Sequence, residues 1–153
     1  MADTTLINQI EVTLVTGNRV AAGSNGDVFL QLGPREFNLR LPPNPTGPTE
    51  RDKGVRNEYT LGQGANIVNK DRNDPRKDLP LKTYDLEAVP AALRFKGQSD
   101  DDAWNLEEAV VRAQSQDGEQ VWTRMAGNAN NLWLGNKFGN VCYLIQTQFI
   151  HAG

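Results

Sequence analysis

The sequence predicts an all-β protein, an antiparallel β-sandwich of about eight strands. Short segments in which apolar and polar residues alternate recur along the chain, which is the period of half-buried strands. Clusters of Gly, Pro, Asn and Asp separate these segments and are typical of turns. With 153 residues, the chain has the size of one domain, and we expect residues 1–153 to form it.

The first half of the chain contains four predicted strands. Residues 10–15 alternate most clearly, and further strands are expected at residues 27–33, 36–41 and 57–61. Between the first two lies a turn segment with three glycines, whose conformational freedom suits a loop. Two other loops interrupt the pattern: a proline-rich loop at residues 42–48 and a charged insertion at residues 66–82. We expect the insertion to be solvated, because it shows no apolar face.

The second half contains four more predicted strands, at residues 89–95, 106–113, 119–125 and 141–150. Residues 106–113 also fit a helical spacing, but the Asp117-Gly118 pair that follows is a hairpin signal and favours a strand. In the last strand, alternation places Val141, Tyr143, Ile145, Thr147 and Phe149 on one face. The core is expected to include Ile10, Val12, Leu14, Val28, Leu30, Val121 and Ile145.

Charge and composition exclude several classes of function. The net charge of −3 provides no basic field for phosphates, so we expect no nucleic-acid partner. One cysteine and one histidine do not suffice for a zinc site of thiolates and imidazoles or for an internal disulfide. No stretch has the roughly 18 apolar residues of a membrane span, and the start lacks a secretory signal, which predicts a cytoplasmic protein that is not integral to a membrane.

The sequence shows no catalytic signature, so we expect no enzymatic activity and no catalytic residue. His151, the single imidazole, lies three residues from the end of the chain, where a positioned general base is rare. Cys142 lies within an apolar strand pattern, which favours a buried and unreactive thiol.

Several segments resemble, in the same order, those of the PLAT domain, the lipoxygenase-homology β-sandwich. The resemblance spans roughly residues 8–145 and is carried by the motifs Val-Thr-Leu-Val-Thr-Gly at 12–17, Ala-Ala-Gly-Ser-Asn-Gly-Asp at 21–27, Tyr-Thr-Leu at 59–61, Ala-Trp-Asn-Leu at 103–106 and Leu-Trp-Leu at 132–134. It implies a PLAT-like sandwich that uses its end loops for interaction.

In some PLAT domains calcium lies between two of these loops, and the resemblance carries that site over to the present chain. Asp100 and Asp101 would supply carboxylates, Ala21 and Gly23 backbone carbonyls, and Asn25 or Asp27 a further oxygen. A cation would also relieve the repulsion among the consecutive acids. Gly23 and Gly26 are expected to let the loop turn its carbonyls inward. Calcium-binding members have an acid where Ala21 stands, so the expected affinity is weak, on the order of 0.1–1 mM.

Trp133 lies in an asparagine-rich segment and has two interpretations. The resemblance makes it a structural closing residue, whereas an aromatic platform beside Asn130 and Asn131 is typical of a ligand surface for sugars or lipids.

The leading hypothesis is a non-enzymatic interaction module that binds a protein partner or a lipid surface through its end loops, tuned by calcium. A carbohydrate-binding β-sandwich and a structural subunit of a larger assembly are the alternatives. The sequence alone does not choose the partner among protein, lipid and sugar.

Overall fold

A computed structural model describes residues 5–124 and 132–151 of the chain. The fold is all-β, with 47% of the residues in strands, as the alternating pattern predicted. Every pair of neighbouring strands is antiparallel, and the strand order is β3-β2-β5-β9-β7-β6-β1-β4, with the short β8 added beside β6. The strands are β1 (Gln9–Thr16), β2 (Asp27–Leu32), β3 (Arg35–Leu39), β4 (Arg56–Gly62), β5 (Ala92–Lys96), β6 (Ala103–Ser115), β7 (Gly118–Arg124), β8 (Trp133–Gly135) and β9 (Val141–His151).

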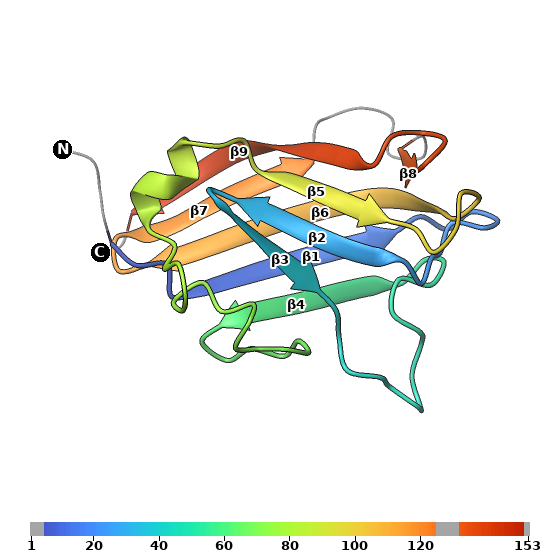
Figure 1. Cartoon of the computed structure of the whole chain (residues 1–153), viewed down its shortest axis with the longest axis horizontal. Coiled ribbons are helices and arrows are strands. Elements are labelled where there is room, and N and C mark those ends of the chain that lie inside the picture. The colour runs from blue at the N-terminus through green and yellow to red at the C-terminus, as the bar shows by residue number, and fades with distance from the viewer. Residues whose placement is uncertain (1–4, 125–131, 152–153) are drawn as a thin grey trace.

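The strands form two layers that share β9 (Figure 1). One layer contains β4, β1, β6, β7 and β9, and the other contains β3, β2, β5 and the first part of β9. Because β9 pairs with both β5 and β7, the chain of hydrogen-bonded strands is continuous around that side of the sandwich. The hairpin between β6 and β7 turns at Gln116-Asp117, and Gly118, which pairs with Ser115 at the start of β7, has a φ of 137° that suits glycine.

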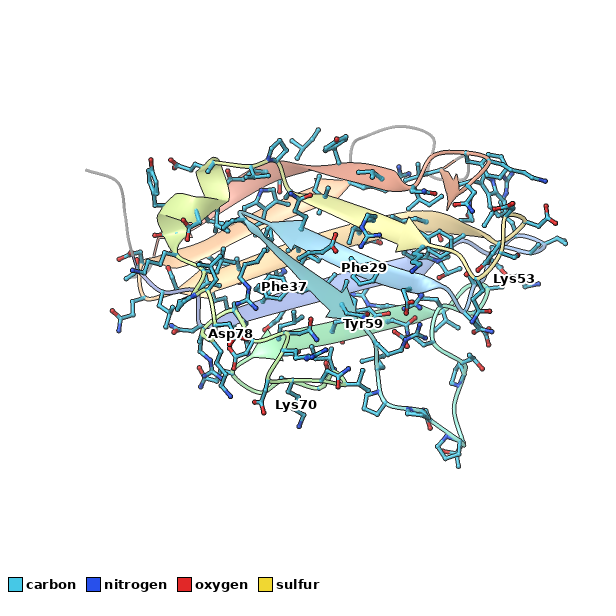
Figure 2. The ribbon with its side chains drawn as sticks, viewed as in Figure 1. Phe29, Phe37, Lys53, Tyr59, Lys70 and Asp78 are labelled. Atoms are coloured by element: carbon cyan, nitrogen blue, oxygen red, sulfur yellow. The ribbon has the colours of Figure 1, made fainter. Side chains whose placement is uncertain are left out.

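The core lies between the two layers and follows the predicted alternation in the first strands. Ile10, Val12, Leu14, Val28 and Leu30 are all buried. Phe37 and Tyr59 extend from β3 and β4 into the space between the layers (Figure 2). Val121 is buried as well.

The inward face predicted for the last strand is wrong. Ile145 is 45% exposed, and Val141 and Tyr143 are also exposed, whereas Cys142 and Leu144 belong to the core. Thr147 is exposed, and the side chain of Phe149 lies outside the described residues. Residues 141–145 are all apolar, so periodicity alone gives no preference between the two faces. The packing selects Cys142 and Leu144, and β9 presents an apolar stripe on its outer surface.

The charged segment of residues 66–82 is docked rather than fully solvated, which corrects the sequence expectation. Ile67 and Leu81 are buried in the core, and the amide of Val68 donates to the carbonyl of Arg40 across 2.9 Å. The side chain of Arg35 donates to the carbonyls of Asp74, Lys77, Leu79 and Arg72. The segment is hydrogen-bonded to β3 and to β4, the two ends of the strand order, which do not pair with each other.

Two elements were not foreseen: the strand β8 and the 3-10 helix η1 (Thr83–Glu87). A strand of three residues is too short to show an alternating pattern. Within the described ranges, the model contains no helix with the length and apolar character of a bilayer span.

Candidate functional site

Three loops gather at one end of the sandwich (Figure 1). They are residues 17–26 between β1 and β2, residues 97–102 between β5 and β6, and residues 136–140 between β8 and β9. A pocket of about 360 Å³ lies among them, which we call the end pocket. It is lined by Ala21, Gly23, Asp101, Asp102, Ala103, Trp133 and Phe138.

The loop of residues 17–26 is fixed from two sides. The amide of Asn105 in β6 donates to the carbonyl of Ala22 across 2.9 Å, and the amide of Ser24 donates to the carbonyl of Arg51 across 3.2 Å. The side chain of Arg51 is completely buried, donates to Oε2 of Glu50 across 2.8 Å and also contacts the carbonyl of Gly26. A buried charge of this kind needs such partners, so the guanidinium holds the base of the loop in place.

The glycines of this loop serve close packing rather than unusual backbone angles. Neither Gly23 nor Gly26 has a positive φ, whereas Ala21 has a φ of 61°. A Cβ atom on Gly23 would lie 2.8 Å from the carbonyl oxygen of Arg51, and one on Gly26 would lie 2.6 Å from that of Lys96. The expectation that Gly23 and Gly26 turn the loop through unusual backbone angles is therefore wrong. Both positions need glycine because another backbone segment approaches too closely for a Cβ atom.

Each acid of the turn at residues 98–102 accepts hydrogen bonds from the protein itself. Oδ1 of Asp100 accepts from Nδ2 of Asn136 across 2.9 Å, and Oδ1 of Asp101 accepts from Nζ of Lys137 across 2.6 Å. The two carboxylate oxygens of Asp102 accept from the hydroxyl of Ser24 and the amide of Gln98, both across 2.8 Å. The repulsion among the three acids is thus offset by donors on neighbouring loops and on the turn itself.

An ion pair between Lys137 and Asp101 joins two of the loops around the end pocket. The hydrogen bond from Lys137 lowers the pKa of Asp101, and the same contact raises the pKa of Lys137. Both side chains are largely exposed, so the pair lies at the solvent boundary of the end pocket.

The model brings some of the predicted calcium ligands together and separates others. Ala21, Gly23 and Asp101 line the end pocket, and Asp100 lies on the same turn as Asp101. Asp27 instead forms an ion pair with Arg40 across 2.9 Å. Asn25 lines a second depression, of about 620 Å³, beneath the proline-rich loop of residues 42–48.

The donor set of the end pocket does not fit a calcium cage as folded. Calcium takes six to eight oxygen ligands. Among the residues that the model describes, no group of three or more His, Cys, Asp and Glu side chains is placed to hold a metal. Asp101, one of the two acids that line the pocket, has one carboxylate oxygen bound to the ammonium group of Lys137.

The aromatic part of the site differs from the predicted platform. Trp133 lies in β8, opposite Asn105 of β6, and its ring centroid is 6.3 Å from that of Phe138. Asn130 and Asn131, the amides expected beside Trp133, lie outside the described residues. Phe138 is 62% exposed, and Val20 on the neighbouring loop is 88% exposed. Two apolar side chains therefore project from this end.

Sequence reasoning missed Val20, Lys137 and Phe138 as parts of the site. The one local signal was the segment Gly135-Asn-Lys-Phe-Gly139, in which two glycines enclose an aromatic and a basic residue, the composition of an exposed turn. Its position beside the acidic turn depends on the pairing of β8 with β6, which the sequence did not reveal.

Comparisons with known proteins identify the fold. No sequence-family profile and no curated protein matches the chain. Among solved structures, alpha toxin from Clostridium absonum is similar, with a TM-score of 0.56, 19% identity, 92% of this chain covered and 32% of that chain. Alpha-toxin of Clostridium perfringens gives a TM-score of 0.53 at 19% identity, covering 92% and 31% of the two chains.

A coral 8R-lipoxygenase, whose structure is described as showing calcium activation via a C2-like domain, has a TM-score of 0.52 at 16% identity. The match covers 90% of this chain and 17% of that chain. The chain thus spans about a third of the length of the toxin chains and about a sixth of the lipoxygenase. The matched regions are C2-like or PLAT domains, so the chain has a PLAT-like fold.

Proposed function

We propose that the chain is a binding module without catalytic activity of its own that docks on a lipid surface through the end pocket and the loops around it. One observation carries the proposal: the side chains of Val20 and Phe138 are exposed on two of the loops that surround the end pocket. Exposed apolar side chains with a half-buried tryptophan beneath them are suited to the interfacial region of a bilayer.

The likeness to the C2-like domain of a lipoxygenase and to the alpha toxins supports this choice of partner. In those chains the matched region is one part of a longer protein. By this likeness we propose that the present chain is an accessory module as well.

A vesicle co-sedimentation assay tests the proposal. The chain is mixed with vesicles of phosphatidylcholine and phosphatidylserine in equal parts, and the bound fraction is compared for the wild type and for Val20→Ser with Phe138→Ser. We expect the double variant to lose most of the binding, because each exposed apolar side chain adds roughly 1–3 kcal/mol of transfer free energy.

The matched control is Leu79→Ser. Leu79 is 58% exposed but lies on the segment of residues 66–82, away from the end pocket. Equal binding by all variants, or no binding by the wild type with or without calcium, would overturn the proposed function.

Contact with a protein is a second candidate, favoured by the apolar stripe of Val141, Tyr143 and Ile145 on the outer face of β9. Light scattering tests the simplest form of protein contact, which is self-association of this chain. A dimer that Tyr143→Asp dissociates would support it, and a monomer at all concentrations would exclude it.

A further inference from the structure

The acidic turn of the end pocket has a cation supplied by the chain itself. Nζ of Lys137 lies 2.6 Å from Oδ1 of Asp101, so an ammonium group already occupies one of the two oxygens that this carboxylate offers to a metal ion. Asp100 and Asp102 are satisfied by Asn136, Ser24 and Gln98. A metal ion that used the oxygens bound to these donors would have to displace them.

We propose that the ammonium group of Lys137 takes the place of a metal ion at the end pocket and is the group that contacts lipid phosphate. The second part rests on the proposed function. An ammonium group has three N–H donors, and Asp101 accepts from one of them, which leaves donors for phosphate oxygens.

The neighbours of Lys137 place it at the level of lipid headgroups. It directly precedes Phe138, whose exposed ring lies beside Trp133. When Phe138 enters the interfacial region, the long side chain of Lys137 keeps its charged end among the headgroups. The whole chain has a net charge of −3 and Lys137 is paired with Asp101, so the contact with phosphate comes from the remaining N–H donors of Lys137 rather than from the overall field. Docking of this kind is independent of calcium.

Thermal melts test the replacement of the metal without using a membrane. Wild type and Lys137→Met are compared in chelator and in about 5 mM calcium, several times the dissociation constants of weak calcium modules. We expect the wild-type curves to coincide. Lys137→Met should be stabilised by calcium, because its Asp101 is free to bind the ion. If calcium raises the melting temperature of the wild type, or leaves that of Lys137→Met unchanged, the proposal that Lys137 takes the place of a metal ion is overturned.

Vesicle binding in chelator tests the contact with phosphate. With vesicles of phosphatidylcholine and phosphatidylserine in equal parts, Lys137→Met should bind about five-fold more weakly than the wild type, the usual effect of one basic residue at an anionic surface. The charge-matched control is Lys70→Met, since Lys70 lies on the segment of residues 66–82, far from this end (Figure 2).

The two arms separate failure of the inference from failure of the proposed function. Wild-type binding that requires calcium, or equal binding by wild type and Lys137→Met, overturns the role of Lys137 while docking on lipid stands. Absence of wild-type binding under all conditions overturns docking, and the melts still decide whether Lys137 replaces the metal.

Discussion

The hydroxyl group of Tyr59 donates a hydrogen bond to Oε2 of Glu50 across 2.6 Å. The same oxygen accepts from the buried guanidinium of Arg51 across 2.8 Å. Arg51 in turn holds the loop of residues 17–26 through its carbonyl and its side chain. A buried polar network therefore connects the core to the end pocket.

The first prediction concerns alkaline pH. Burial, the largest cause, raises the pKa of Tyr59 above its usual value of about 10. Because the folded-state pKa exceeds the unfolded one, the stability that Tyr59 contributes is complete below about pH 10 and is lost as the pH rises further. Urea denaturation at about pH 8 and pH 11 should show this loss in the wild type and a smaller one in Tyr59→Phe.

Tyr84→Phe is the control for this experiment, because Tyr84 is exposed. It should follow the wild type at both pH values. An equal loss of stability in Tyr59→Phe and wild type would show that Tyr59 ionises no less readily in the folded protein.

The second prediction concerns the anchor of the segment of residues 66–82. Arg35→Met removes donors to several backbone carbonyls, among them that of Asp74 at 2.7 Å. Hydrogen bonds to a charged group contribute about 1.5–3 kcal/mol each, so we expect a loss of at least about 2 kcal/mol in unfolding free energy. Arg56→Met removes only an exposed ion pair with Glu58 and should cost less than about 1 kcal/mol. Equal costs for the two variants would contradict the anchoring role.

The third prediction tests which side chains form the core. Leu14→Ala or Leu30→Ala removes a completely buried side chain and should cost about 2–5 kcal/mol. Ile145→Ala removes a side chain on the outer face of β9 and should cost less than about 1 kcal/mol. Denaturation of the three variants in urea provides the comparison, and a cost for Ile145→Ala as large as that for Leu14→Ala would place Ile145 inside.

The strands were predictable wherever one face is polar. In β1 the polar Glu11 and Thr13 alternate with buried neighbours, so the sequence pattern specifies both the strand and its orientation. In β9 five consecutive apolar residues, 141–145, specify a strand without an orientation, and the choice of Cys142 and Leu144 depends on packing against the other layer.

The segment of residues 66–82 shows a different limit of prediction from sequence. Its attachment depends on Ile67 and Leu81 near its two ends and on backbone carbonyls that face Arg35, a residue more than 30 positions earlier. Neither feature produces a periodic pattern within the segment.

The candidate site was predictable only in part, because some of its contacts join residues that are far apart in the sequence. The acidic turn and the glycine-containing loop are visible as local sequence features. The donors to Asp100 and Asp101 come from Asn136 and Lys137, which are both 36 positions from their partners. Only the pairing of β8 with β6 brings them together.

The last prediction is that two substitutions convert the end pocket into a calcium site. Ala21 lines the pocket beside Asp101 and has a φ of 61°, a conformation that Asp and Asn adopt more readily than Ala. Ala21→Asp therefore adds a carboxylate without added backbone strain, and Lys137→Met frees the carboxylate of Asp101. The double variant should bind calcium more tightly than Lys137→Met alone, because a hard cation gains affinity from each carboxylate ligand.

Isothermal titration calorimetry with calcium measures the gain. Ala21→Asn with Lys137→Met is the matched control, since it keeps the shape of the new side chain but adds no charge, and its affinity should lie between those of Lys137→Met and the double variant. Ala21→Asp alone should bind more weakly than the double variant, because Lys137 still occupies Asp101. If the double variant releases no more heat with calcium than the wild type, the carbonyls and carboxylates of the end pocket do not converge on a common point, and Lys137 does not occupy the place of a metal ion.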